Sequence, residues 1–352
     1  MAFLVLNQTK WEWFKLRRRW MPWVLVAIAL LFSQLAVWGP FFAYQQQKRN
    51  GVAELSRFGY GATAADGTNL RYEISCQDVM AGNLPGLPPG LTEADLAGFK
   101  ENCRQLMQQR EQSLLATARA FTLPGSIAEA LRVAQGFGVI LIAIMTASLV
   151  GTEYGWGTLR TSLLRGPGRG AFLAGKLALM LAGGLVLTGA VALAGIASGA
   201  AAGALAGTGS SFFGAGFLGN LALDIGKAWF SLWPFVALAA LFSTLARSSA
   251  AGMAGAIGYY FAEVIASGIF MELFDWARKV GDYLLVRNAS AWMQDLRLSP
   301  ADGGAQMGLV LSFRSNPSAL HAFLVLAAYT LALSALAFWV FKRRDVTAGG
   351  GG

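Results

Sequence analysis

Residues 170–176 are arranged like a phosphate-binding loop, in which glycines and a lysine cradle phosphate groups. They read G-A-F-L-A-G-K, but the pattern fails at three points. Leu177 stands where a serine or threonine must hold magnesium, the intervening residues are apolar, and no strand precedes them. We therefore predict that this chain has no ATP site of its own, and that Lys176 contacts lipid headgroups or a partner surface.

Other residues that could do chemistry are few. The chain has one histidine, His321, and two cysteines, Cys76 and Cys103, which makes a hydrolase or a multi-ligand metal site a poor fit. Glu263 is the one acid well inside an apolar run. An ionisable side chain is costly in a membrane, so Glu263 is a candidate for a transport path; alternatively it reaches interfacial water on the outer side.

The composition is that of an integral membrane protein. Of 352 residues, 55% are hydrophobic and only 13% are charged, whereas soluble domains have about 25% charged residues. Several apolar runs are long enough to span about 30 Å of hydrocarbon. The net charge of +9 does not indicate nucleic-acid binding, because the lysines and arginines flank apolar runs and form no single patch.

One basic segment, residues 151–176, separates two of these runs. Its cationic residues lie within a few positions of the membrane: Arg160, Arg165, Arg169 and Lys176. Such a loop is expected to face the cytoplasm. Residues 157–165 can form a short helix on the membrane surface, with leucines on one side: Leu159, Leu163 and Leu164.

The order of residue types in this segment resembles the ABC-2 type (type V) permease family, the membrane subunits of ABC exporters. The matching positions are Glu153, Gly157, Thr158, Leu159, Arg160, Leu163, Leu164, Arg165, Pro167, Arg169 and Lys176. The resemblance implies that residues 157–165 are a coupling helix that docks onto a separate ATPase subunit. The alternative is an ordinary basic loop in an unrelated membrane protein.

The resemblance also implies roles and partners. The three leucines would fill an apolar groove on the ATPase, and Arg160, Arg165 and Arg169 would pair with its acidic rim or with lipid phosphates. Glu153 would pair with a basic residue near the N-terminus, such as Arg17 or Arg18, or be an interfacial acid held by water. We expect two ATPase subunits, which carry the ATP and magnesium, and a dimer with a second copy or a related permease. No cofactor is expected on this chain.

The fold expected to position these residues is an all-α polytopic membrane protein with six transmembrane helices. In chain order we predict an interfacial elbow helix (1–19), TM1 (20–44), an extracytoplasmic domain (45–129), TM2 (130–150), the coupling loop (151–170), TM3 (171–195), an outer or re-entrant Gly/Ala-rich segment (196–222), TM4 (223–246), TM5 (249–270), extracytoplasmic re-entrant helices (271–317), TM6 (318–341) and a cytoplasmic tail (342–352). A second membrane crossing within residues 177–223 would place Arg247 and the C-terminal basic residues outside. That would contradict the enrichment of Lys and Arg on the cytoplasmic side of membrane proteins. The glycines at 195, 199, 203 and 207 suggest a helix-packing face, or chance in a Gly-rich chain.

The extracytoplasmic domain has its own pattern. Residues 92–121 begin with a capping-box-like sequence and keep helical spacing, and residues 70–76 are suited to a strand. On this oxidising side Cys76 and Cys103 are expected to form a disulfide, although two free thiols remain possible.

Together these features favour the permease subunit of an ATP-driven exporter of a hydrophobic or amphipathic substrate. It would lie in a bacterial or archaeal cytoplasmic membrane with both termini inside, in contact with membrane lipids. Two other classes stay open: a membrane-anchored sensor built around residues 45–129, and a membrane enzyme that acts on lipid.

Overall fold

The computed structural model describes residues 2–54, 58–63, 69–74, 76, 80, 93–159, 161, 163, 168–208, 214, 216–299 and 317–343. Its elements, in chain order, are α1 (Ala2–Arg17), α2 (Trp20–Glu54), β1 (Phe58–Thr63), β2 (Asn69–Ile74), α4 (Glu93–Phe121), α5 (Gly125–Gly155), α7 (Arg169–Ala206), α8 (Phe217–Ala246), α9 (Ser249–Leu273), α10 (Asp275–Gly281), α11 (Leu285–Gln294) and α12 (Ala319–Arg343). The regular elements among the described residues are therefore helices, apart from one antiparallel pair of strands.

The helices identify a multi-pass membrane protein. Within the described ranges, five helices are long and apolar enough to cross a bilayer: α2 over Trp20–Arg49, α5, α7, α8 and α12. The 25-residue α9 is not among those five. The predicted sixth span, TM5, corresponds to α9 and stays a prediction.

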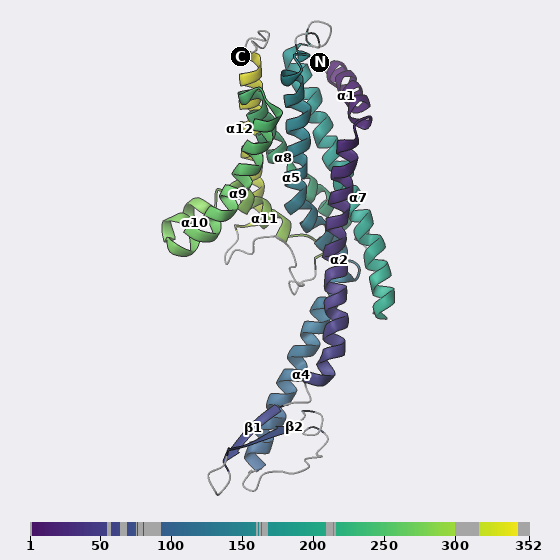
Figure 1. Cartoon of the computed structure of the whole chain (residues 1–352), viewed down its shortest axis with the longest axis vertical. Helices are drawn as coiled ribbons and strands as arrows, with labels where there is room; N and C mark the ends of the chain where they lie inside the picture. Colours follow the sequence, from purple (N-terminus) through teal and green to yellow (C-terminus); the bar gives the residue numbers. More distant parts are fainter. Residues whose placement is uncertain are drawn as a thin grey trace.

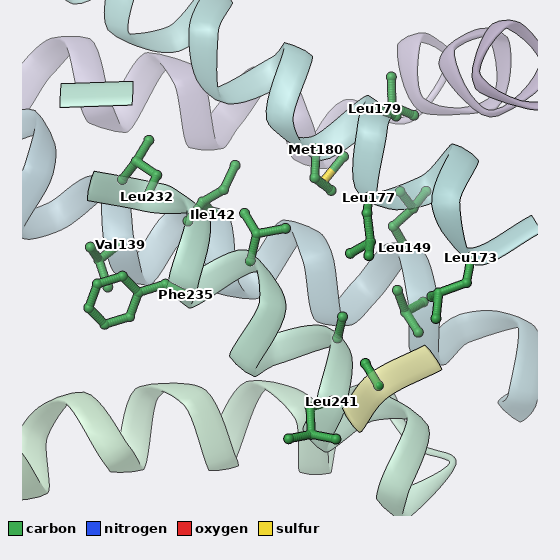
Figure 2. Packing of buried hydrophobic residues seen from close by; sticks show 14 of the residues in the cluster. Val139, Ile142, Leu149, Leu173, Leu177, Leu179, Met180, Leu232, Phe235 and Leu241 are labelled. Carbon is green, nitrogen blue, oxygen red and sulfur yellow. The ribbon is translucent and has the colours of Figure 1, made fainter. Parts of the chain in front are cut away.

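α5 is the centre of the bundle, because it packs against α2, α7, α8 and α9. Figure 2 shows the apolar core between these helices, to which α5 contributes Val139, Ile142 and Leu149 and α8 contributes Phe235. Small residues let α7 approach α5 closely. A Cβ added to Gly195 would lie 3.2 Å from the Ile127 Cα. Gly199 and Gly203 face the same neighbourhood, so the predicted packing face is confirmed for these three glycines. Gly207 instead ends α7 in a left-handed conformation.

Two helices continue beyond the predicted ends of their spans. α2 runs to Glu54, past Pro40, and α7 runs to Ala206, where the sequence suggested spans ending at 44 and 195. Loss of hydropathy marks where a helix leaves the hydrocarbon, and its backbone hydrogen bonds can continue past that level.

The continuation of α2 forms, with α4, a stalk that carries β1 and β2 at its far end (Figure 1). The strands pair antiparallel, with Phe58 opposite Ile74 and Thr63 opposite Asn69, so the expected strand near 70–76 is present as β2. A disulfide joins Cys76 to Cys103 of α4, with 5.5 Å between their Cα atoms. Both chain termini and α1 lie at the opposite end of the molecule (Figure 1).

Candidate functional site

The N-terminal helix α1 lies directly on the first turns of α7. Gly175 makes this possible, because a Cβ at that position would lie only 2.7 Å from the Gln8 Cγ. The Thr9 hydroxyl also donates a hydrogen bond to the Gly175 carbonyl oxygen, at 3.3 Å. This approach brings Glu12, one turn along α1, next to Lys176.

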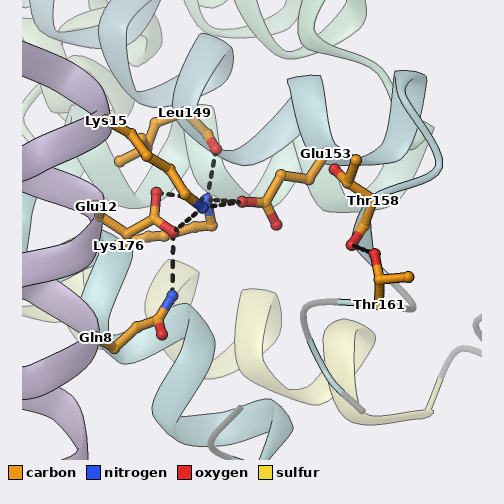
Figure 3. A network of polar contacts seen from close by, with 8 residues as sticks. All are labelled: Gln8, Glu12, Lys15, Leu149, Glu153, Thr158, Thr161 and Lys176. Atoms are coloured by element: carbon orange, nitrogen blue, oxygen red, sulfur yellow. Dashed lines mark hydrogen bonds and ion pairs between the residues drawn. The ribbon is translucent and has the colours of Figure 1, made fainter. Parts of the chain in front are cut away.

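Lys176 is the hub of a buried polar cluster (Figure 3). Its ammonium donates to Glu12 Oε2 at 3.3 Å, to Glu153 Oε1 at 2.9 Å and to the Leu149 carbonyl oxygen at 2.9 Å. An ammonium has three donors, and these three acceptors match them. Lys176 is only 1% exposed, so the expectation that it contacts lipid headgroups or a partner was wrong. Residues 170–176 form the first turns of α7 and are not a loop.

Lys15 completes this group, which we call the Lys176 cluster: Glu12, Lys15, Glu153 and Lys176. The Lys15 ammonium lies 3.1 Å from Glu12 Oε1 and 3.7 Å from Glu153 Oε1. Gln8 donates to the same Glu12 oxygen. Two carboxylates and two ammonium groups balance, which offsets part of the cost of burying them. Glu153 does contact a basic side chain of the N-terminal helix, but Lys15 takes the place expected for Arg17 or Arg18.

The predicted coupling segment begins where α5 ends. Trp156 is the C-cap of α5, and Gly157 follows with φ of 65°, a left-handed conformation that favours glycine. The Thr161 hydroxyl donates to the Thr158 carbonyl oxygen at 2.9 Å. Three of the predicted coupling residues lie outside the described residues: Arg160, Leu164 and Arg165.

The apolar residues of this segment face the chain's own core. Leu159 is 5% exposed and belongs to the main apolar cluster, and Leu163 packs against the same cluster. The suggestion that Leu159 fills a groove on an ATPase is therefore corrected, since its side chain is already enclosed here. Arg169, at the start of α7, donates to the Lys342 carbonyl oxygen at 2.9 Å, which ties α7 to the end of α12.

A cavity of about 320 Å³ opens beside the Lys176 cluster. Charged, hydroxyl and apolar side chains line it together: Glu12, Lys15, Leu16, Arg19, Leu149, Thr152, Glu153, Trp156, Thr158, Thr161 and Lys176. Its volume is in the range of small-molecule sites. The cavity therefore touches α1, the end of α5, the start of α7 and the predicted coupling segment.

A second polar cluster lies toward the other end of α5 and holds the short helix α11. We call it the Arg132 cluster: Glu129, Arg132, Asp224, Lys227 and Asp295. Arg132 pairs with Glu129, donates to the Met293 carbonyl oxygen at 3.4 Å and donates to the Ser299 hydroxyl at 2.6 Å. Lys227 pairs with Asp295 at 2.7 Å.

Asp224 and Glu263 bind backbone N–H groups around α11. Asp224 accepts from the N–H groups of Arg297 and Leu298, both at 2.8 Å. Glu263 accepts from the N–H of Arg287 at 3.0 Å, in the first turn of α11, where such donors have no partner within the helix. Glu263 is 5% exposed. The acid singled out for a transport path thus has a backbone-holding role, and it does not reach interfacial water as the alternative supposed.

Sequence reasoning missed the Arg132 cluster because its members stand at the ends of apolar runs, where charges are routine. A signal was present: near the beginning of both α5 and α8, an acid is followed three positions later by a base, Glu129 by Arg132 and Asp224 by Lys227. Residues at that spacing share one helix face. Over the part of the chain that the structure describes, no three His, Cys, Asp or Glu side chains are grouped to hold a metal ion.

Comparison with known proteins gives one match. The model of the family described as ABC-2 family transporter protein matches residues 6–346, which is nearly the whole chain. No curated protein matches. The family is one of membrane transport components, in keeping with the multi-pass helical fold and with the residue pattern around the basic segment. This chain therefore belongs to the ABC-2 family of transporter proteins.

Proposed function

We propose that this chain is the permease subunit of an ATP-driven ABC exporter. It has six membrane spans, with α9 as the fifth, and works as a dimer with itself or a related permease. Two separate ATPase subunits bind the ATP and magnesium. The substrate is hydrophobic or amphipathic, since the spans present few polar side chains.

The observation that carries the proposal is the Lys176 cluster. It joins α1 to both helices that flank residues 156–168, through one ammonium that bonds Glu12 and Glu153. A force applied to the segment after α5 would therefore reach α1, α5 and α7 together. A basic loop that only sets topology has no need of such a junction.

The membrane orientation follows from charge. Arg17 at the end of α1, the basic segment, and Lys342 with Arg343 at the end of α12 lie at the same end of the molecule (Figure 1). Because positive charge is enriched on the cytoplasmic side, this end and both termini are cytoplasmic, in a bacterial or archaeal cytoplasmic membrane. The stalk and β-strands then lie outside, where the disulfide persists.

In the proposed mechanism, closure of the ATPase dimer moves residues 157–165, and the Lys176 cluster passes the displacement to α7 and α1. α5 passes it further. A Cβ at Gly151 would overlap the backbone of Ser248 and Ser249, so α5 touches the turn between α8 and α9 there. The path between the two permease subunits then changes its exposure.

The test is docking to the ABC ATPase subunit that we expect to be encoded beside this chain. Thr158 and Thr161 are exposed, so Thr158→Glu with Thr161→Glu adds two negative charges without disturbing the core. We expect the double variant to fold and to lose most co-purification with the ATPase and most ATP-driven transport. The matched control is Gln108→Glu with Gln109→Glu, on the exposed surface of α4, which should retain both. Unchanged association and transport in the threonine variant would show that residues 157–165 are not the docking site.

A further inference from the structure

The Glu153 carboxylate has acceptor capacity that the described residues of the chain do not use. Oε1 receives Lys176 and approaches Lys15, while Oε2 has no hydrogen-bond partner among the residues that the structure describes. In Figure 3 this oxygen points away from the two lysines. The side chain is about nine-tenths buried, and a buried acceptor without a donor is costly. A donor from outside the chain would offset that cost.

The rest of the Lys176 cluster is already satisfied, which limits what the donor can be. Lys176 uses its three donors on three acceptors, and both Glu12 oxygens accept bonds. Two basic residues border the cavity: the Lys15 side chain is 49% exposed, and both Lys15 and Arg19 line the cavity. The cavity therefore offers an acid with unused acceptor capacity at one side and two cationic side chains at its rim. A zwitterion, with a primary ammonium and a phosphate, fits that arrangement.

The residues around the cavity indicate that this zwitterion is the headgroup of a membrane lipid. The cavity wall includes Trp156, which is 71% exposed and lies under the Arg19 guanidinium at 5.4 Å. α1 and the first turn of α2 also carry exposed indoles: Trp11, Trp13, Trp20 and Trp23. Trp rings favour the headgroup level of a bilayer, and basic side chains there bind lipid phosphates.

We propose that the cavity beside the Lys176 cluster binds the headgroup of phosphatidylethanolamine, with the ammonium on the Glu153 carboxylate and the phosphate at Lys15 and Arg19. The inner leaflet is assigned from the orientation under the proposed function, whereas the headgroup chemistry does not depend on it. Such a lipid would bridge α1 and the end of α5 next to the docking segment.

The experiment is native mass spectrometry of the purified full-length chain in detergent, without any ATPase. Phosphatidylethanolamine, its mono- and dimethylated forms, phosphatidylcholine and phosphatidylglycerol are added with identical acyl chains. We expect phosphatidylethanolamine to be retained at concentrations about tenfold below those needed for phosphatidylcholine or phosphatidylglycerol. Retention should fall stepwise along the methylated series, because each methyl group removes one N–H donor.

Two variants locate the effect. Glu153→Gln keeps the shape of the side chain but removes its charge, and should abolish the preference for phosphatidylethanolamine. Arg19→Gln should weaken all the phospholipids alike. Glu101→Gln is the control, since this exposed acid on α4 pairs with Arg104 far from the cavity, and it should keep the wild-type preference. The comparison along the methylated series uses only wild-type protein. It therefore still tests the proposal if the Glu153→Gln variant does not fold.

Several results would overturn the assignment. The assignment is overturned if all members of the methylated series are retained equally, or if phosphatidylglycerol is retained most strongly. It is also overturned if the Glu153→Gln variant keeps the wild-type preference. The rival occupant is a basic side chain of the ATPase; it is indicated if the permease shows no preference and the Glu153→Gln variant loses ATPase binding. The lipid preference and ATPase co-purification are read separately, so a lipid preference without docking refutes the proposed function alone, and docking without a preference refutes this inference alone.

Discussion

The two polar clusters at opposite ends of α5 use buried charge differently. Arg132 and Glu153 are 21 residues apart, hence about 30 Å along the helix, the thickness of the hydrocarbon. In the Lys176 cluster, charged side chains from three helices bond mainly to one another. Around the Arg132 cluster, carboxylates and Arg132 bond largely to the backbone of α11 and the residues after it.

This difference has a physical consequence. A backbone N–H held by a carboxylate fixes the path of the chain, since the donor cannot be exchanged without moving the backbone. An ion pair between long side chains holds helices together while their geometry adjusts by rotation of the side chains. The end that we propose to meet the ATPase has the adjustable kind of junction, and the end that carries α11 has the fixed kind.

The largest expected effect is at the hub of the adjustable cluster. Lys176→Ala removes the ammonium that pairs with the buried carboxylates of Glu12 and Glu153. This loss should lower the free energy of unfolding by about 3–5 kcal/mol. The measurement is thermal unfolding in detergent, followed by tryptophan fluorescence. Removing the three buried charges together, with Lys176→Met, Glu12→Gln and Glu153→Gln, leaves only the half-exposed Lys15 charged and should recover most of that stability. A triple variant no more stable than Lys176→Ala would mean that stranded charge is not the cause.

A smaller loss is expected in the fixed cluster. Asp224→Ala leaves the N–H groups of Arg297 and Leu298 without an acceptor, at a cost of about 2–3 kcal/mol. Hydrogen exchange should accelerate first at those two amides. Asp295→Ala is the comparison, because the Asp295 side chain is 61% exposed and its carboxylate pairs with the Lys227 ammonium. We expect that variant to lose less than about 1 kcal/mol. If Asp224→Ala and Asp295→Ala lower the free energy of unfolding equally, hydrogen bonds from the carboxylate to backbone N–H groups are not the main source of stability in the Arg132 cluster.

The contact between α5 and the turn after α8 comes next. Gly151→Ala places a Cβ into the backbone of Ser248 and Ser249, and should cost about 1–3 kcal/mol through overpacking. Gly155→Ala, one turn later in α5, meets no atom within 4 Å and should be neutral or slightly stabilising. The measurement is the melting temperature of each of the two glycine variants, compared with that of the wild-type protein. If Gly155→Ala is the more damaging of the two, α5 does not transmit displacement through that turn.

The smallest effect is at the surface near the termini. Arg169→Gln loses an exposed hydrogen bond to the Lys342 carbonyl oxygen, worth about 0.5–1 kcal/mol. The melting temperature should therefore shift only slightly. A large shift would place Arg169 among the supporting residues of the Lys176 cluster.

Much of the scaffold was predictable from the sequence because its signals are local. Apolar runs located the five helices that are long and apolar enough to cross a membrane, and the clustered basic residues located the basic end. The break predicted after residue 165 lies outside the described residues. The same logic found the helix of α4 and the strand near 70–76. The predicted spans are shorter than the helices α2 and α7. For α2, hydropathy reports the environment of a helix and not where its hydrogen bonds end, whereas the limit for α7 came from the charge of the segments that follow, since its sequence stays uncharged past residue 195.

The sequence by itself therefore determined the class of protein and the position of the basic segment that we propose for docking. Only the tertiary structure decided which charges are buried together. Lys176 and Glu12 are 164 positions apart and meet because Gly175 lets α1 rest on α7. Leu159, which the sequence assigned to a docking surface, instead packs in the core because residues of several helices surround it. Pairing between distant helices depends on how their faces approach, and no local pattern of residues carries that information.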